Sequence, residues 1–180
     1  MGNRHPNYSH ELAHDDQAPV WASHEPRGYV CPFCQLAAGT ADDPANRCEL
    51  SDMVYQDEDV LVFIACDGFG PHAGHAMITP AAHREAIYDL TDDQLTKISI
   101  FSRHVALATK LAWNSPGTSV RQHNEPAGNQ HVWHYHLHVF PRFEDDMLYR
   151  QIRHPLEVEF RAQKARELKS ALDQVLAAAG

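Results

Sequence analysis

Short apolar runs along the chain predict a sheet. Residues 53–65 contain two strand-like runs around an acidic turn, and residues 76–79 form a short apolar run that Pro80 closes. Residues 118–122 and 132–140 are also predicted to be strands. We therefore expect at least five strands, each short enough to be joined to its neighbours in an antiparallel sheet.

Two longer stretches show helical periodicity. From Thr91 to about residue 113, apolar residues recur at a spacing near 3.6, at Leu95, Ile98, Phe101, Val105 and Leu111. Gln94 follows Thr91 at the spacing of a capping box, which marks the start of this helix. A second helix is predicted over about 156–178, and a short one over 35–39 that Gly39 stops.

Together these elements predict one α+β domain. Its antiparallel sheet has one long helix packed on it and an added C-terminal helix. Residues 67–71 and 124–130 are expected to be loops. Residues 1–28 hold four histidines and three prolines without periodicity, so we expect a poorly ordered N-terminal arm before a single domain over 29–180.

Composition narrows the classes of function. Of the 180 residues, 43% are hydrophobic and 22% charged, which is ordinary for a globular protein. A formal net charge of −9 makes nucleic acid a poor partner, because that affinity depends on many lysine and arginine contacts to phosphate. The negative charge does not exclude a small phosphate ligand, because a few local hydrogen-bond donors can hold one. We find no apolar run of membrane-spanning length and no signal-peptide core, so we expect no membrane contact and a cytoplasmic location.

Fourteen histidines are many for this length, and three of them alternate with apolar residues at 134, 136 and 138. Side chains two positions apart in a strand point to one face, so these imidazoles should project together, roughly 6.6–6.8 Å from one to the next. Histidine is not a preferred strand former, and three neighbouring rings that can ionise need a ligand or a reaction to explain them. Their alternation with apolar residues lets the opposite face pack into a core.

Two functions compete for the histidine face. One metal cannot easily reach all three rings, because they spread over roughly 13 Å while zinc ligands lie about 2.0–2.1 Å from the ion. Nucleophilic catalysis is the preferred interpretation, because an imidazole with an ordinary pKa near 6.5 is largely neutral at pH 7.

Residues 128–142, Gly-Asn-Gln-His-Val-Trp-His-Tyr-His-Leu-His-Val-Phe-Pro-Arg, closely resemble the signature of the histidine-triad (HIT) family of nucleotide hydrolases and transferases. That signature is His-φ-His-φ-His-φ-φ, where φ is apolar. Residues 54–64 and 74–80 are similar to earlier sheet segments of the family. The resemblance covers roughly residues 30–145 and implies a HIT-like fold.

The resemblance also implies roles for single residues. His136 matches the nucleophile that attacks the α-phosphorus and carries a nucleotidyl intermediate. His138 matches the catalytic residue that contacts the α-phosphate, where an imidazolium would stabilise charge. His75 matches a histidine at the phosphate end of the site. Asp67, eight residues earlier, matches the carboxylate that accepts hydrogen bonds from the ribose hydroxyls.

In the loop before the triad, Asn124, Gly128 and Gln130 match positions that hold phosphate in the family. The chain has Gly-Asn-Gln where several branches have Gly-Gln, which shifts Gln130 by one residue. Gly128 would let the backbone approach the ligand closely. His131 occupies a position where the family usually has Ser, Thr or Asp. It would either donate a proton to the leaving group or simply be exposed.

Cys31 and Cys34 have the two-residue gap that lets two thiolates reach one zinc. A redox motif would need a thioredoxin-like strand–CxxC–helix arrangement, which we do not find. The resemblance implies that His83 and His134 complete a closed, structural Cys₂His₂ zinc site. The alternative is a reduced thiol pair with His83 as an ordinary loop residue.

The resemblance implies a nucleotide hydrolase that cleaves at the α-phosphate of a purine nucleoside phosphoramidate or dinucleoside polyphosphate. It also implies that the protein forms a homodimer and that the reaction needs no catalytic metal. Two alternatives remain open. One is a nucleotidyl transferase similar to galactose-1-phosphate uridylyltransferase, whose motif reads His-Pro-His in a chain about twice as long. The other is a nucleotide-binding regulator with vestigial catalysis.

Overall fold

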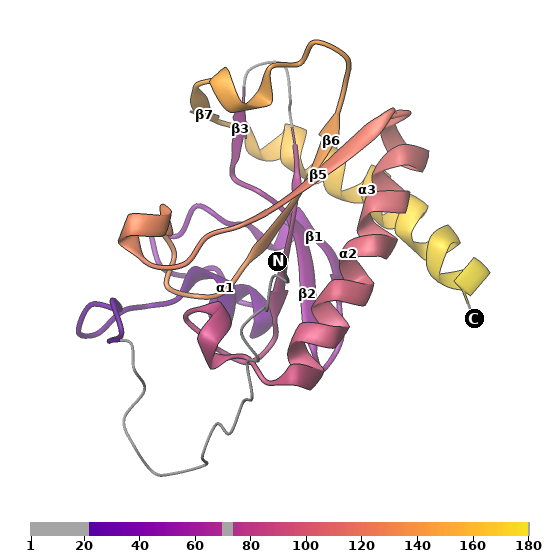
Figure 1. Ribbon diagram of the computed structural model, residues 1–180. Helices are drawn as coiled ribbons and strands as arrows, with labels where there is room; N and C mark the ends of the chain where they lie inside the picture. The colour runs from indigo at the N-terminus through magenta and orange to yellow at the C-terminus, as the bar shows by residue number, and fades with distance from the viewer. Residues whose placement is uncertain (1–21, 70–73, 180) are drawn as a thin grey trace, which may run out of the picture.

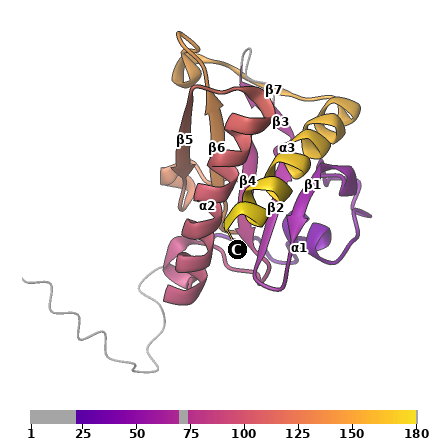
Figure 2. The same ribbon diagram turned by 90° about the vertical axis from the view of Figure 1, so that its right-hand side faces the viewer.

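The structure is a computed structural model that describes residues 22–69 and 74–179. Figure 1 shows the course of the chain. Five antiparallel strands form the main sheet in the order β1-β2-β4-β6-β5, which can be followed in Figure 2. They are β1 Met53–Gln56, β2 Val60–Ile64, β4 Ala76–Pro80, β5 Gly117–Gln122 and β6 Leu137–Arg142. The α+β class predicted from the sequence is confirmed.

Two long helices cover one face of this sheet. Figure 2 shows α2, Asp92–Trp113, and α3, Val158–Ala179, side by side in front of the strands. The predicted capping box at Thr91 is present, and α2 ends at Asn114 in the left-handed conformation. The main hydrophobic core lies between this face and the helices, so α3 completes the core as well as extending the chain.

A short helix covers part of the opposite face. Helix α1, Pro32–Ala37, buries Phe33 and Leu36 in a second core cluster with residues of β2 and β4. The helix begins three residues before the predicted start at 35, because the Cys31 sulfur accepts a hydrogen bond from the Cys34 amide and Pro32 suits the first helical position. The Cys-x-x-Cys pair therefore belongs to the start of a helix.

A second, two-stranded sheet includes a segment that was predicted to be a loop. Residues 67–71 were expected to be a loop, but Asp67–Phe69 form β3, which pairs antiparallel with β7, Arg153–Pro155. Each strand has three residues and its partner lies far away in the chain, so no local periodicity reveals it. Four 3₁₀ turns complete the described elements: Leu50–Asp52, Ile87–Asp89, Pro126–Gly128 and Leu148–Arg150.

The histidine strand begins later than expected. The predicted strand starts at residue 132, but β6 begins at Leu137, so His134 and His136 precede it. The pairing of β4 with β6 stops at Ile78 and Leu137, and the carbonyl of Pro80 accepts a hydrogen bond from the His134 ring at 3.0 Å. Alternation nevertheless persists, since Tyr135 and Val139 are buried in the main core while the histidines face the other way.

One residue of the predicted helix stripe is exposed, and another, Leu95, is only half-buried and outside the core cluster. Leu111 is 58% exposed, and Ile100 and Leu107 of α2 are also exposed. At the other end of the chain, residues 22–28 of the predicted arm contact the domain, for example where the His24 amide donates to Glu85 at 2.7 Å. The rest of that arm, 1–21, lies outside the described residues. No helix within the described ranges is long and apolar enough to cross a membrane.

A buried ion pair anchors the loop that precedes β1. Arg161 of α3 and Asp52 are both almost fully buried, and the Arg161 Nε donates to the Asp52 Oδ1 at 2.9 Å. The same guanidinium donates to the backbone carbonyl of Arg47 at 3.0 Å. Since a buried guanidinium needs all its donors satisfied, this contact fixes the backbone at Arg47.

Candidate functional site

A cavity of about 340 Å³ opens on the face of the sheet that α2 and α3 do not cover. Five of the predicted site residues line it: Asp67, His75, His131, His136 and His138. Phe33, Ala65 and Met77 give one part of the wall an apolar surface. The cavity thus combines an apolar part with a group of imidazoles.

The hydrogen bond of His136 defines which ring nitrogen is free. Its Nδ1 lies 2.7 Å from the backbone carbonyl of His134. A carbonyl oxygen only accepts, so Nδ1 carries the proton and Nε2 keeps its lone pair. Burial, the main cause, lowers the pKa of His136 to about 4. The ring is therefore neutral at pH 7, which is the nucleophilic form.

His75 and His138 form a hydrogen-bonded pair beside His136. The His75 Nε2 and the His138 Nδ1 are 2.9 Å apart, and the His75 ring stacks on Phe140 at 4.0 Å between centroids. Burial above all lowers the pKa of His75 to about 3 and that of His138 well below its usual range. The expected imidazolium at His138 is therefore not the form of the ligand-free protein. A bound phosphate would favour protonation again.

Three predicted phosphate-binding residues do not line the cavity and instead hold the loop before the triad. Gln130 is 2% exposed, accepts from the Glu125 amide and donates to the carbonyls of Glu85 and Val132. Asn124 accepts from the Ile87 amide at 2.8 Å. The Gly128 carbonyl accepts from a neighbouring histidine ring. These contacts fix the shape of the loop that carries Asn129 and His131 to the cavity wall.

Sequence reasoning missed several cavity residues. His123 follows β5, and its Nδ1 donates to the Gly128 carbonyl at 2.7 Å, which leaves its Nε2 as the other polar atom of the ring. Arg121 of β5 lies opposite His138 in the strand register, and its guanidinium lies 4.5 Å from the centre of the Phe140 ring. Arg47 and Arg153 also line the cavity. Strand pairing would have indicated Arg121, but nothing local indicates the other two.

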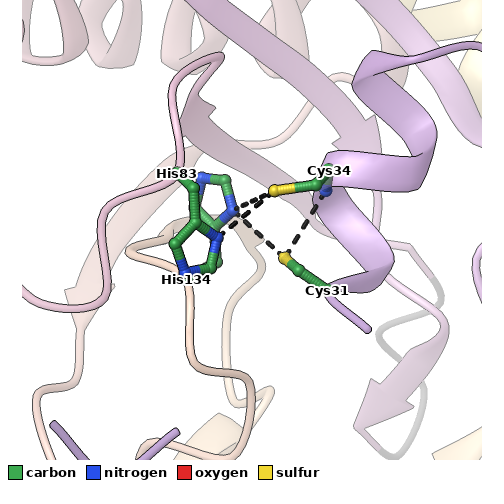
Figure 3. Close-up of side chains that lie close together, drawn as sticks. All are labelled: Cys31, Cys34, His83 and His134. Carbon is green, nitrogen blue, oxygen red and sulfur yellow. Dashed lines mark hydrogen bonds between the residues drawn. The ribbon is translucent and has the colours of Figure 1, made fainter. Parts of the chain in front are cut away.

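The four predicted metal ligands meet at one point (Figure 3). Ligand atoms of Cys31, Cys34, His83 and His134 all lie within 4.8 Å of one another. The His134 Nδ1 is 3.3 Å from the Cys31 sulfur and 3.6 Å from the Cys34 sulfur, and the His83 Nδ1 is 3.2 Å from the Cys34 sulfur. Tetrahedral zinc bonds of about 2.3 Å to sulfur and 2.0–2.1 Å to nitrogen would place such atoms about 3.5 Å apart.

Outer contacts orient both histidines of this cluster. The other ring nitrogen of His134 donates to the Pro80 carbonyl at 3.0 Å, and that of His83 donates to the Glu25 carboxylate at 2.9 Å. Each Nδ1 therefore points its lone pair at the thiols, which is the tautomer a metal needs. Burial raises the pKa of Cys34 to about 12 and also that of Cys31, and a bound cation would reverse this.

The remaining two cysteines also meet, although their spacing in sequence gives no sign of it. The sulfurs of Cys48 and Cys66 are 3.3 Å apart, and both thiols are free. Both cysteines line the cavity. In the sequence, Cys48 directly follows Arg47 and Cys66 directly precedes Asp67. The thiol pair therefore joins the loop before β1 to the start of β3.

Comparison with known proteins identifies the family. The model of the HIT domain matches residues 47–145, and the chain belongs to this family. It is 31% identical to "Protein hit" of Bacillus subtilis over 113 residues, 63% of this chain and 71% of that protein. It is also 31% identical to an uncharacterised HIT-like protein of Methanocaldococcus jannaschii over 118 residues, 65% of this chain and 82% of that protein.

Solved structures agree with this assignment. A zinc-bound histidine triad family protein of Mycobacterium smegmatis is 27% identical, with a TM-score of 0.67 over 83% of this chain and 97% of its own. Diadenosine triphosphate hydrolase of Plasmodium falciparum shares the fold at 14% identity, with a TM-score of 0.61 over 79% of this chain and 97% of its own. The resemblance to the HIT family seen in the sequence is confirmed.

The buried, neutral His75 should make stability depend on pH. Its pKa is about 3 in the folded protein and about 6.5 in an unfolded chain. Between these values the unfolded chain binds a proton that the folded protein refuses, so stability is lost as pH falls from 6.5. Urea unfolding at pH 7.5, 6 and 5 should show this decline. His75→Asn, which cannot take up the proton, should show a shallower decline, and an equal slope in both proteins would contradict the assignment.

Proposed function

We propose that the chain is a nucleotide hydrolase that cleaves between the α-phosphate and its leaving group. The substrate is a purine nucleoside phosphoramidate or a dinucleoside polyphosphate, and the reaction passes through a nucleotidyl-histidine. The observation that carries this proposal is the bond from the His136 Nδ1 to the His134 carbonyl, because it gives the cavity a neutral ring with a free Nε2. Membership of the HIT family supports it.

In the first step the Nε2 of His136 forms a bond to the α-phosphorus, and the bond from phosphorus to the leaving group breaks. The leaving group departs with the electron pair and takes a proton, for which His131 at the cavity wall is the proposed donor. Positive charge develops on the His136 ring. The His134 carbonyl stabilises that charge, since it already accepts from Nδ1.

In the second step water attacks the same phosphorus, the bond to Nε2 breaks and the nucleoside monophosphate leaves. The water loses a proton, which restores the donor used in the first step. His75 and His138 meet the phosphate oxygens as a hydrogen-bonded pair, and Arg121 places a fixed positive charge nearby. These groups can bind the phosphate without a catalytic metal.

Replacing the nucleophile should abolish turnover. We expect His136→Asn to lower kcat/KM for adenosine 5'-phosphoramidate and for diadenosine triphosphate by at least about a thousandfold. Asparagine can still donate to the His134 carbonyl, so the fold and nucleotide binding should survive, as thermal unfolding and calorimetry can verify. His154→Ala removes an exposed histidine outside the cavity and is the control.

Other outcomes would favour the alternatives. If wild-type protein binds nucleotide but turns over neither substrate, a regulator is supported. If an added phosphate compound receives the nucleotidyl group, so that little nucleoside monophosphate forms, a transferase is supported. Turnover that survives His136→Asn would exclude the nucleotidyl-histidine, which mass spectrometry of the quenched wild-type reaction should detect.

We also propose that Cys31, Cys34, His83 and His134 hold a structural zinc ion. The four donors fit a closed tetrahedral site and leave no open position for substrate. The zinc-bound relative from Mycobacterium smegmatis supports the choice of metal. Bound there, zinc would fasten the start of α1 to the backbone segment that presents His136.

Elemental analysis tests the metal site. Protein purified without added metal should carry about one zinc per chain, and Cys34→Ser should lose most of it and unfold at a lower temperature. Cys66→Ser removes a thiol outside the cluster and should retain the zinc. A wild-type content far below one equivalent would exclude the site.

We further propose that two copies form a homodimer through α2 and β5. Ile100, Leu107 and Leu111 lie on one side of α2 by their spacing and are 48%, 48% and 58% exposed. Strand β5 ends the main sheet, and its Val120 is 49% exposed. A second copy would cover this apolar surface and the open strand edge together.

Light scattering after size exclusion should give about twice the chain mass for the wild type. Leu107→Glu places a charge on the proposed contact and should give a monomer. Leu50→Glu changes a similarly exposed leucine on the turn before β1, at the edge of the sheet opposite β5, and should leave the dimer intact. A wild-type monomer at micromolar concentration would contradict the proposal.

A further inference from the structure

The carboxylate expected to bind ribose already has charged partners. Arg47 donates to Asp67 through two nitrogens, at 2.6 Å to Oδ1 and 3.3 Å to Oδ2. Arg153 lies 3.6 Å from the same Oδ2. A carboxylate that binds a ribose diol accepts hydrogen bonds from two hydroxyls. Here the Arg47 fork already takes one acceptor site on each oxygen, and Arg153 lies beside Oδ2, so few acceptor sites remain for a diol.

Charge at this end of the cavity is positive. Asp67 is the one carboxylate among the described residues that line the cavity, and Arg47, Arg121 and Arg153 line it too. At Asp67 itself, two guanidiniums face a single negative charge. This excess stands out in a chain with a net charge of −9. A neutral ribose diol would leave this excess positive charge without a counter-charge, whereas an anionic group on the ribose would supply one.

The two arginines are accessible and held in place. Their side chains are 52% and 55% exposed, while Asp67 is 18% exposed. The backbone of Arg47 is fixed by the buried Arg161. Arg153 lies on β7, opposite Phe69 of β3, so the small sheet sets its position beside Asp67. The family model ends at residue 145, so Arg153 belongs to the C-terminal segment that follows the matched domain.

We infer that the cavity binds a nucleotide that carries a phosphate on the 2' or 3' oxygen of its ribose, in addition to the 5' phosphorus at His136. This inference rests on the proposed function for the orientation of the nucleotide. The guanidiniums of Arg47 and Arg153 donate to the ribose phosphate, and Asp67 holds them toward it. A planar guanidinium matches phosphate oxygens through two parallel hydrogen bonds, so the pair is suited to this group.

Calorimetry with product analogues tests this inference without turnover. Wild-type protein should bind adenosine 2',5'-bisphosphate or adenosine 3',5'-bisphosphate at least about tenfold more tightly than AMP. Because the contacts are exposed ion pairs, this ratio should shrink as salt rises from 50 to 500 mM. Arg153→Ala and Arg47→Ala should each reduce it severalfold, and the double variant should bring it close to one.

Arg150→Ala is the matched control, because Arg150 is exposed, lies three residues from Arg153 and does not line the cavity. It should retain the wild-type ratio. Thermal unfolding shows whether each variant is folded, and Arg153→Lys, which keeps the charge but loses the fork, should give an intermediate ratio. Equal binding of AMP and both bisphosphates by the wild type, or a ratio that survives the double variant, overturns the inference.

Hydrolysis assays separate this inference from the proposed function. If adenosine 5'-phosphoramidate is hydrolysed but the binding ratio is near one, only the ribose phosphate is excluded. If neither phosphoramidate nor polyphosphate is hydrolysed but the ratio is tenfold, the reaction is excluded and the ribose-phosphate site stands.

Discussion

The site depends on one hydrogen bond, from the Nδ1 of His136 to the carbonyl of His134. It fixes the tautomer of the proposed nucleophile and turns the free nitrogen to the cavity. The acceptor belongs to a residue whose own ring points at two thiols and whose Nε2 is bonded to Pro80. The orientation of the nucleophile is therefore linked to the cysteine–histidine cluster through a single peptide unit.

Much of this arrangement is readable in the sequence because its periodicity is local. Alternation around 134–138 places histidines on one side and Tyr135 and Val139 in the core, even though β6 begins later than the pattern suggests. Thr91 and Gln94 cap α2 as their spacing indicates. The Cys31–Cys34 spacing and the family resemblance together found all four members of the cluster.

What the sequence did not reveal depends on contacts between distant segments. Strands β3 and β7 exist only as a pair, and Cys48 lies beside Cys66 because the antiparallel β1 and β2 between them turn the chain back. Gln130 matches a family position that holds phosphate, but its side chain bonds three backbone groups, those of Glu125, Val132 and the distant Glu85, because a buried amide must find such partners. Arg47 and Arg153 reach the cavity from either end of the matched family domain, where no motif marks them.

The position of β7 has a consequence for how such proteins diverge. A short strand beyond the shared domain contributes Arg153 to the cavity wall, while His136 and His138 belong to the shared domain itself. Of the residues proposed to choose the ligand, Arg153 therefore lies outside the shared domain, whereas Arg47 and Asp67 lie inside it. Exchange of the tail that begins near residue 146 would remove Arg153 from the cavity without altering the histidine segment, so relatives that differ in this tail can share the proposed reaction and differ in the proposed ribose-phosphate contact.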